Sequence, residues 1–330
     1  MSTHLNKKIE IDAVITWVDG DDEEFSKKRK SYTSNNNINE STNSTRFNQV
    51  DELSIAVKSI FKFAPFVRKI YILTDNQTPQ IIKQSEQWKK SFQDRIKLVD
   101  HKEVFSNYLD VLPTFNSSTI ETMLQYIDGL SEHFIYFNDD MFLIKPTKVE
   151  DWFLNGKPVI RGKWLTPPDK IWYKKIRNFL FPSKRKKFSF KRAQAISAKI
   201  EGFDKKYFRT YHSPRALNKI ILKDYFNNNL KLLKDQIKYR FRKSSQFISY
   251  SLIWHYSIKM NLAIISNELC LQEINIRSNS NTKGILKKIQ YAIDNNNILF
   301  LNIQSLDILD IDTLNSVNEL LHDLTYIDLE

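Results

Sequence analysis

The feature that most constrains the fold is a repeated pattern in which a short apolar segment ends at polar side chains. Residues 11–18 read IDAVITWV and lead directly into Asp19 and Gly20. A mostly apolar, β-branched run of this length is typical of a strand buried within a parallel sheet. The sequence therefore predicts a buried strand that delivers an acidic side chain to a loop.

The same pattern recurs along the first half of the chain. Three further apolar runs end at Asp or Asn residues, and they cover residues 69–74, 96–99 and 133–137. Helical patterns lie between them, at 53–61 before Pro65 and at 117–126. Alternating strands and helices predict an α/β fold, Rossmann-like, with a mostly parallel sheet flanked by helices. We expect ligands to bind beyond the carboxyl ends of the strands.

The rest of the chain divides by composition. Residues 26–45 are polar and of low complexity, which predicts a flexible loop. With six Gly and nine Pro residues, the chain has the composition of a packed globular protein. We predict one catalytic domain over residues 1–330. Its three parts are an α/β core at 9–156, a basic aromatic insertion at 157–195 and a mostly helical part at 196–330 that completes the active site.

The formal net charge of +12 is concentrated in the insertion. Thirteen Lys and Arg residues lie between Lys157 and Arg192, against the single acid Asp169, and aromatic residues such as Trp172 lie among them. This mixture suits an anionic membrane surface, a polyanionic substrate or nucleic acid. A solvated hairpin whose aromatic residues pack on the protein body fits the pattern equally well.

Targeting signals and cysteine content indicate in which cellular compartment the protein works. The first 20 residues lack the apolar core of a signal peptide, and no segment approaches the roughly 20 apolar residues of a membrane helix. These observations predict a cytoplasmic protein, with residues 157–192 offering a peripheral contact to the inner face of the cell membrane. Cys270 is the one cysteine and no motif surrounds it, so we expect it to fill the core.

The strand at 133–137 ends in three polar residues, Asn138, Asp139 and Asp140. Two adjacent carboxylates at a strand end suit a hard cation, Mg²⁺ or Mn²⁺, which would bind them together with substrate phosphate oxygens. Asp-Asp pairs are also common in ordinary solvated turns. The position directly after an apolar strand is what favours a metal site here.

Other candidates are scattered along the chain. Asp19 could bind a sugar hydroxyl and Trp17 could stack on a ring, although a turn and a core aromatic are the alternatives. Four basic residues are candidate phosphate clamps, because guanidinium and ammonium groups bind phosphate oxygens: Arg46, Lys58, Arg215 and Arg242. Each could equally be a surface residue. His101 and His212 are candidate acid–base groups, or ordinary satisfied polar residues.

Several nucleotide-binding and hydrolytic motifs are absent from the sequence. It contains no P-loop, no Gly-x-Gly-x-x-Gly, no Gly-x-Ser-x-Gly and no His-Glu-x-x-His. This disfavours kinases, dehydrogenases, α/β-hydrolases and zinc proteases.

Together these segments resemble the Stealth family of hexose-1-phosphoryl transferases, which includes bacterial capsule polymerases and the catalytic subunit of lysosomal-enzyme GlcNAc-1-phosphotransferase. The first block resembles residues 11–20, and the second resembles 45–79 and continues through VDHKEVF, LPTFNSSTIE and FIYFNDDMF. The third resembles 211–226, followed by RFRKSSQF and the aromatic run at 250–256, and the fourth resembles 298–307. In the last block, Leu301-Asn302-Ile303 stands where the family usually has Leu-Asn-Asp. The resemblance implies that this carboxylate is absent here or is supplied elsewhere, as by Asp307.

The resemblance implies a reaction and a GT-A-like form of the sheet. A hexose- or N-acetylhexosamine-1-phosphate would pass from a UDP-sugar to a hydroxyl of an oligosaccharide or polysaccharide acceptor, releasing UMP, in the synthesis of capsule or another surface polysaccharide. Such transfer requires neutralised charge and in-line positioning more than covalent chemistry.

The resemblance also implies roles for residues. Asp140 would be the general base with Asp139 on the metal, although these two roles could be exchanged, and His212 is the competing base. Asp139, Asp140 and Asn302 are the candidate metal ligands. Arg242 and His212 would bind the transferred phosphate, and Asp19 would assist at the sugar or nucleotide. The implied donor-binding residues are Thr16, Trp17, Arg46, Asn116, Asn138 and Arg215.

Two other functional classes remain open from the sequence. A metal-dependent glycosyltransferase would use a similar sheet and acidic motif but would release UDP, so the released nucleotide separates the two reactions. A basic module that binds nucleic acid or membrane is disfavoured, because the strand-end acids would repel a phosphate backbone, and we expect no nucleic acid partner. Such binding would weaken steeply with salt.

Overall fold

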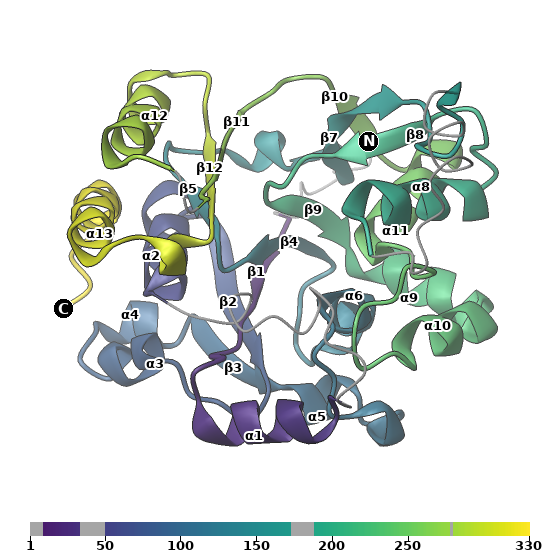
Figure 1. Ribbon diagram of the computed structural model, residues 1–330, viewed down its shortest axis with the longest axis horizontal. Coiled ribbons are helices and arrows are strands. Elements are labelled where there is room, and N and C mark those ends of the chain that lie inside the picture. Colours follow the sequence, from purple (N-terminus) through teal and green to yellow (C-terminus); the bar gives the residue numbers. More distant parts are fainter. Residues whose placement is uncertain (1–8, 34–49, 173–187, 278–279) are drawn as a thin grey trace, which may run out of the picture.

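The computed structural model describes residues 9–33, 50–172, 188–277 and 280–330 (Figure 1). Its central sheet consists of β1 (Ile11–Thr16), β2 (Val67–Thr74), β3 (Ile96–Asp100), β4 (His133–Asn138) and β9 (Arg215–Asn218). The strand order is β3-β2-β1-β4-β9; the first four strands are parallel, and β9 is antiparallel to β4. The predicted α/β fold with a mostly parallel sheet is confirmed.

The strand order creates a topological switch point between β1 and β4. The chain passes from β1 to β2 on one side and later returns to place β4 on the other side. Thr16, the last residue of β1, pairs with Asn138, the last residue of β4. Polar residues that follow these two strands therefore meet at one edge of the sheet, which is where open α/β sheets bind ligands.

The central strands are apolar on both faces because helices cover both. Ala13 and Ile15 of β1 pack in a core with α2 (Glu52–Phe63), α12 (Thr282–Asp294) and α13 (Ile311–Thr325). Val14 points to a second core with α9 (Lys219–Asn228), α10 (Leu230–Ile237) and α11 (Ser249–Lys259). The two helical layers lie on opposite sides of the sheet in Figure 1. This burial accounts for the continuous apolar runs in the sequence.

A three-stranded sheet joins the C-terminal segment to the end of β4. It consists of β11 (Leu271–Asn275), β12 (Phe300–Gln304) and β5 (Met141–Leu143). β5 begins directly after Asp140 and runs antiparallel to β12, with Met141 opposite Asn302. This pairing brings a residue from near the end of the chain to the edge where β1 and β4 end.

The remaining elements complete the two layers and a small outer sheet in which β7 pairs with β6, β8 and β10. They are α1 (Glu23–Ser31), α3 (Gln80–Ser85), α4 (Lys90–Gln93), α5 (His101–Val104), η3 (Leu109–Val111), α6 (Ser117–Ile120), η4 (Glu121–Tyr126), η5 (Val149–Asp151), β6 (Phe153–Leu154), β7 (Lys157–Leu165), α8 (Phe190–Ile200), β8 (Tyr207–Thr210), β10 (Ile264–Ser266) and η6 (Leu306–Ile308).

The prediction of a loop from residue 26 is wrong for 26–31, which belong to α1. The Asp22 side chain caps this helix by accepting a hydrogen bond from the backbone N–H of Phe25 at 2.8 Å. Acidic residues occupy its first turn and basic residues its last, which complements the helix dipole. The remainder of the predicted loop that spans 34–45 lies outside the described residues.

Two other predictions need adjustment. The helix expected at 117–126 begins at Ser117 but tightens into the 3₁₀ helix η4 from Glu121. The second half of the chain is mostly helical, as expected, yet it also contributes five strands among its described residues. One of them, β9, is an edge strand of the central sheet.

Part of the basic insertion is ordinary protein interior. Trp164 on β7 packs against Phe203, Phe208 and His255, while Trp172 is exposed. Residues 173–187 lie outside the described residues. None of the helices in the described ranges is long and apolar enough to cross a membrane.

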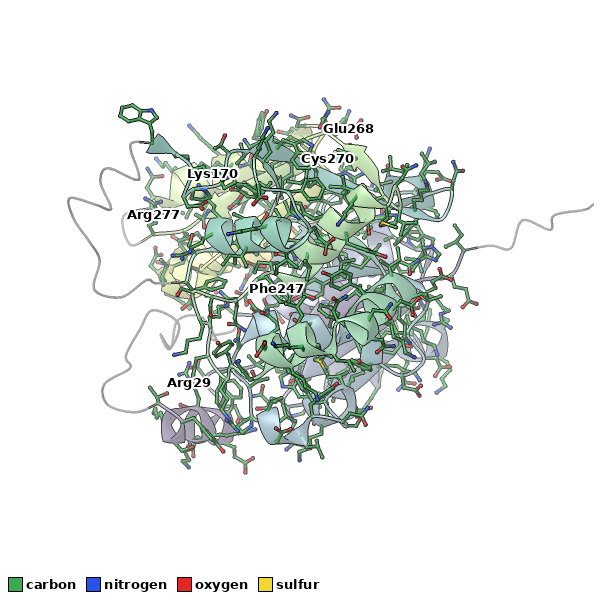
Figure 2. The ribbon with its side chains drawn as sticks, turned by 90° about the vertical axis from the view of Figure 1, so that its right-hand side faces the viewer. Arg29, Lys170, Phe247, Glu268, Cys270 and Arg277 are labelled. Carbon is green, nitrogen blue, oxygen red and sulfur yellow. The ribbon has the colours of Figure 1, made fainter. Side chains whose placement is uncertain are left out.

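Cys270 behaves as the sequence predicts. It is buried with a free thiol at the start of β11 (Figure 2), and burial raises the pKa of that thiol. A buried thiol with a raised pKa has little thiolate at neutral pH, so it is inert core filling rather than a nucleophile.

Candidate active site

Two cavities meet at the switch-point edge of the central sheet. The first has a volume of about 380 Å³ and is walled by aromatic residues and by the acids after β4. The second, of about 330 Å³, extends from the same edge toward α8 and β8. Five residues line both cavities: Ser117, Asn138, His212, Arg242 and Gln304. These shared residues define the junction where two bound molecules would meet.

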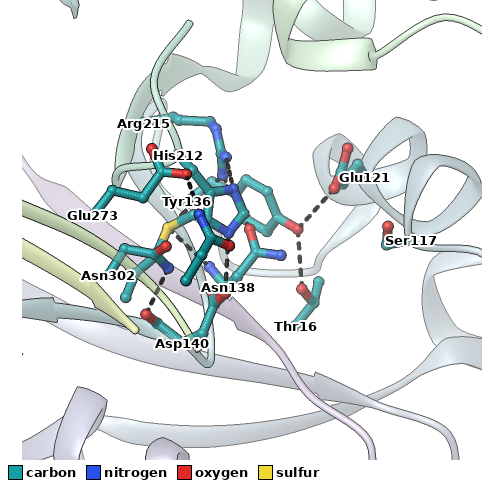
Figure 3. Close-up of polar contacts among 12 residues, drawn as sticks. Thr16, Ser117, Glu121, Tyr136, Asn138, Asp140, His212, Arg215, Glu273 and Asn302 are labelled. Atoms are coloured by element: carbon teal, nitrogen blue, oxygen red, sulfur yellow. Dashed lines mark hydrogen bonds and ion pairs between the residues drawn. The ribbon is translucent and has the colours of Figure 1, made fainter. Parts of the chain in front are cut away.

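Asp140 lines the first cavity, next to His212 at this junction, and is held from two sides (Figure 3). Its Oδ2 atom is 3.0 Å from Nε2 of His212, and its backbone carbonyl accepts a hydrogen bond from the side chain of Asn302 at 2.8 Å. Burial alone would raise the pKa of Asp140, but His212, Asn302 and Arg215 together hold this pKa below its usual value. Asp140 is therefore ionised at neutral pH.

The second neighbour of His212 indicates which tautomer of its ring fits these contacts. Nη2 of Arg215 lies 3.4 Å from Nδ1 of His212. A guanidinium group can only donate hydrogen bonds, so Nδ1 is the acceptor and the ring proton resides on Nε2. His212 therefore donates to Asp140 and anchors that carboxylate, with neither ring nitrogen free to act as a base in this arrangement.

Arg215 is almost fully buried, with 1% of its surface exposed. Its Nη1 atom donates to Oδ1 of Asn138 at 3.0 Å, and its guanidinium lies 4.1 Å from the ring centroid of Tyr250. Hydrogen bonds and a cation–π contact compensate the loss of hydration. The structure thus places Arg215 beneath the junction, where it orients Asn138 and His212.

A buried hydrogen-bonded chain supports the end of β1. The hydroxyl groups of Thr16 and Tyr136 are 3.0 Å apart, and the Tyr136 hydroxyl donates to Oε1 of Glu121 at 3.3 Å. Burial raises the pKa of Glu121, opposed mainly by the charges of Arg215 and Arg242. The sequence patterns did not single out Tyr136 or Glu121, because one lies in an apolar run and the other in a helical one.

Arg242 is the arginine that lines both cavities. Its guanidinium donates to the hydroxyl of Ser117 and lies 5.2 Å from the ring centroid of Phe188. Burial lowers the pKa of Arg242, and the negative charge of Glu121 is the main influence that raises it. Because the pKa of an arginine is normally far above 7, Arg242 remains charged. It therefore supplies fixed positive charge at the junction.

The first cavity contains a glutamate that the sequence patterns did not single out. Glu52, the first residue of α2, lines this cavity together with Asp139 and Asp140. Burial, followed by the charge of Asp139, raises the pKa of Glu52 to about 8. Glu52 therefore carries a proton at neutral pH and adds no negative charge beside Asp139 and Asp140.

The oxygen atoms around Asp140 fit a hard cation. Oδ1 of Asp140 and Oδ1 of the fully buried Asn302 are both buried without a hydrogen-bond partner. Carboxylate and amide oxygens are suitable ligands for Mg²⁺, which commonly takes one or two carboxylates and completes its shell with water and phosphate oxygens. No group of three or more His, Cys, Asp or Glu side chains within the described ranges is arranged to hold an ion. The residues present therefore fit a cation shared with a substrate.

Ile303 does not leave a gap in the cavity wall. Successive residues of a strand face opposite sides, and along β12 Asn302 reaches Asp140 and Gln304 lines both cavities, while Ile303 packs in the hydrophobic core. An acid at position 303 in this register would face the core. Asp307, the alternative carboxylate from the sequence, lines the first cavity.

Two predicted site residues have structural contacts and line neither cavity. Asp19 accepts a hydrogen bond from the backbone of Asp21 at 2.9 Å, and so closes a turn after β1. Asn116 caps α6 through the backbone N–H of Ser118 and also bonds Gln246. Both stabilise loops that border the cavities.

The other predicted residues divide into three groups. Thr16, Trp17 and His101 line the first cavity, and burial lowers the pKa of His101 to about 4, so it is neutral. Lys58 lines neither cavity. Arg46 lies outside the described residues.

Comparison with known proteins gives matches to the first half of the chain. Residues 10–37 match the model for Stealth protein CR1, conserved region 1, and residues 46–160 match that for Stealth protein CR2, conserved region 2. The chain is 44% identical over 154 residues to the capsular polysaccharide phosphotransferase fcs1 of Haemophilus influenzae, covering 46% of this chain and 40% of that protein. It is 40% identical over 144 residues to the exopolysaccharide phosphotransferase cps2G of Lactiplantibacillus plantarum, covering 44% and 39%.

Among solved structures, the galactosyltransferase LgtC in complex with donor and acceptor sugar analogues matches with a TM-score of 0.47 and 10% identity, over 96% of this chain and 97% of that one. The chain spans about two fifths of the length of the two curated relatives named above. Asn138, Asp139 and Asp140 all fall within conserved region 2, and Thr16 and Trp17 within conserved region 1. Both models match in order along the chain, so this chain contains regions similar to conserved regions 1 and 2 of Stealth proteins.

Proposed function

We propose that this chain transfers a sugar 1-phosphate from a UDP-sugar to a hydroxyl group of an acceptor sugar, forming a phosphodiester and releasing UMP, in the synthesis of a capsule or other surface polysaccharide. The observation that carries the proposal is Asp140, an ionised carboxylate of the first cavity with one oxygen unpartnered, held by His212, which lines both cavities. The relatives with the matching regions are capsular and exopolysaccharide phosphotransferases, and this supports the same class of reaction.

The first cavity suits the donor. Trp17, Phe25 and Phe115 form an apolar wall at the end of β1, where a base or ribose would pack. The strand-end acids lie in the same cavity, on the side where the diphosphate would need charge neutralisation. This placement matches the position of nucleotides in other doubly wound sheets.

The cation is part of this proposal. Asp139, Asp140 and the side-chain oxygen of Asn302 would hold Mg²⁺ or Mn²⁺. A bound divalent cation would supply positive charge to the diphosphate and so offset the repulsion between the donor and the strand-end acids. Glu52, with its raised pKa, would stay uncharged beside it.

The protein groups at the junction would act on the transferred phosphate and on the acceptor. Arg242 supplies a permanent cation, and the bond to Ser117 fixes its direction. We assign Asp140 as the base that takes the proton of the acceptor hydroxyl, since His212 has its ring proton on the side of Asp140. A new oxygen–phosphorus bond forms, the bond from phosphorus to the UMP oxygen breaks, and that oxygen leaves with the electron pair.

The released nucleotide tests the proposal. The pure protein is incubated with a panel of UDP-sugars, Mg²⁺ and candidate oligosaccharides, and the nucleotides are separated while ³¹P NMR follows the sugar products. UMP together with a phosphodiester signal is the expected result. Release of UDP with a new glycosidic bond would instead establish a glycosyltransferase and remove the proposal.

The membrane contact remains a separate proposal. Among the described residues of the basic segment, Lys163, Lys170 and Trp172 are exposed, a combination that suits an anionic lipid surface. Flotation with phosphatidylglycerol vesicles, comparing the full chain with a variant that lacks residues 166–187, tests it. Equal flotation of both proteins would contradict a role for this segment.

A further inference from the structure

The second cavity carries positive charge that the proposed chemistry does not use. Four cationic side chains line this cavity: Lys191, Arg209, Arg215 and Arg242. Only two acidic side chains, Glu121 and Glu273, line it with them. Arg215 and Arg242 have the contacts already described. Arg209 and Lys191 have no role in the transfer step, and they lie on the side of the cavity formed by β8 and α8.

Arg209 is only partly exposed, and its Nε atom is buried without a hydrogen-bond partner. Across the described part of the chain, no carboxylate lies within ion-pair distance of either Arg209 or Lys191. Lys191 is exposed, but Arg209 is partly withdrawn from water, and a charged group in that position without a partner is unfavourable. An anion bound in the cavity would supply the missing partner.

The backbone around Arg209 is held in place from both sides. The backbone N–H of Thr210, next to Arg209, donates to the side chain of Gln194 on α8 at 2.8 Å. On the other side, β8 lies so close to β7 that a Cβ atom at Gly162 would be 2.4 Å from the carbonyl oxygen of Arg209. Only glycine permits this approach, and together these contacts fix Arg209 at the cavity wall.

The same cavity has aromatic walls. Phe188, Phe190 and Tyr250 line it, and the ring of Phe190 stands nearly perpendicular to the ring of His212, with centroids 6.3 Å apart. Aromatic faces pack against the apolar faces of sugar rings. The cavity therefore combines surfaces for a sugar with cations for an anion, and it opens at the junction with Asp140.

We propose that the second cavity binds the acceptor, and that Arg209 with Lys191 selects an acceptor sugar that carries a phosphate group. The proposal rests on the proposed function and deepens it by naming the chemistry of the acceptor. A hydroxyl of a sugar bound here reaches the junction shared with the donor cavity, while its phosphate lies toward α8. Arg209 is a specificity residue and takes no part in the transfer of the proton or the phosphoryl group.

Kinetics with two matched acceptors test this assignment. One acceptor is a disaccharide of two hexoses joined through a phosphodiester, and the other is the glycosidically linked neutral disaccharide of the same hexoses. For Arg209→Gln we expect the KM for the phosphorylated acceptor to rise about tenfold or more, as loss of a charged hydrogen bond does. The KM for the neutral acceptor and for the donor should stay unchanged. Lys199→Gln, an equal charge change at an exposed site on α8, is the control.

A binding measurement separates this proposal from the proposed function. The ³¹P signal of the phosphorylated disaccharide is titrated with protein in the absence of donor. We expect the wild-type chain to broaden the ³¹P signal of the disaccharide. Arg209→Gln should cause no broadening, and Arg209→Lys should restore part of it. If no nucleotide is ever released but this pattern holds, the proposed reaction fails and the anion subsite stands. Equal binding by Arg209→Gln, or a rise in the donor KM alone, would overturn the subsite.

Discussion

The Nε2 atom of His212 lies 3.0 Å from Oδ2 of Asp140, although 72 residues separate the two along the chain. The contact depends on the pairing of β9 with β4, which sets Arg215 opposite Tyr136 and so brings the loop before β9 to the end of β4. The same arrangement places Arg215 against the other ring nitrogen of His212. Histidine, carboxylate and arginine therefore act as one unit.

Replacement of Asp140 by Asn should remove turnover while the donor still binds. The amide keeps the size of the side chain but cannot accept a proton from the acceptor hydroxyl, and a positioned base contributes about 10²–10⁴-fold to a rate. We expect kcat to fall by at least about 100-fold. Donor affinity is measured by calorimetry, and Asp169→Asn, at an exposed position, is the control. An unchanged kcat in Asp140→Asn would remove the assignment of the base.

His212→Gln should move the acidic limb of the pH–rate profile upward. His212 is the largest of the influences that lower the pKa of Asp140, so its removal raises that pKa. A base acts only when it is deprotonated, so the rate of the variant should begin to fall at a higher pH than that of the wild type. The dependence of kcat/KM on pH, measured between pH 4 and 8, tests this. If the rate of both proteins falls at the same pH, His212 does not lower the pKa of Asp140.

Asn302→Leu should weaken the response to Mg²⁺. The substitution keeps the side-chain volume but removes the buried oxygen beside Asp140 and the bond to its backbone carbonyl. We expect the Mg²⁺ concentration for half-maximal activity to rise about 10–100-fold, as for other groups that orient a metal site. Gln272→Leu, on the neighbouring strand β11 and outside both cavities, is the control. A superimposable Mg²⁺ titration would exclude Asn302 from the metal site.

Glu52→Gln should flatten the pH dependence of stability. The pKa of Glu52 is raised by folding from 4.5 to about 8, so the folded chain binds this proton more tightly than the unfolded chain. The resulting stabilisation is complete below about pH 4.5 and is lost as the pH rises toward 8. An uncharged Gln avoids this loss. The difference in Tm, variant minus wild type, should therefore grow by roughly 5 °C as the pH rises from 5 to 8.

The Glu52 measurement is made in EDTA, because a bound cation would favour the carboxylate. Glu24→Gln, at an exposed position on α1, provides the control for removal of one negative charge. A constant difference in Tm between Glu52→Gln and wild type across this range would show that folding does not raise the pKa of Glu52.

The sequence alone identified the sheet and its functional edge. Apolar, β-branched runs that end at Asp or Asn predicted β1 to β4, because a strand covered by helices on both faces leaves no polar position until it reaches the loop. This local rule found Trp17, Asn138, Asp139 and Asp140, since each lies at or next to a strand end, whereas Thr16 came from the resemblance to the Stealth family. It needed no knowledge of which strands are neighbours.

The tertiary structure decided which distant side chains join that edge. Glu52 and Glu121 occupy ordinary helical positions in the sequence, and only the packing of α2 and η4 against the strand ends brings them to the cavities. From the sequence, Arg215 could be a phosphate clamp or a surface residue. In the structure it is buried under the junction, because β9 pairs with β4. Burial and partners are properties of the packed chain, so no local pattern encodes them.

Strand β12 shows most clearly what the sequence determined and what the tertiary structure decided. The sequence showed that Ile303 stands where an acid is usual, which suggested a weakened metal site. The register of β12 against β5 turns Asn302 toward Asp140 and Ile303 into the core. Composition determined which groups are available, and strand register, which depends on contacts between segments about 160 residues apart, determined which of them face the chemistry.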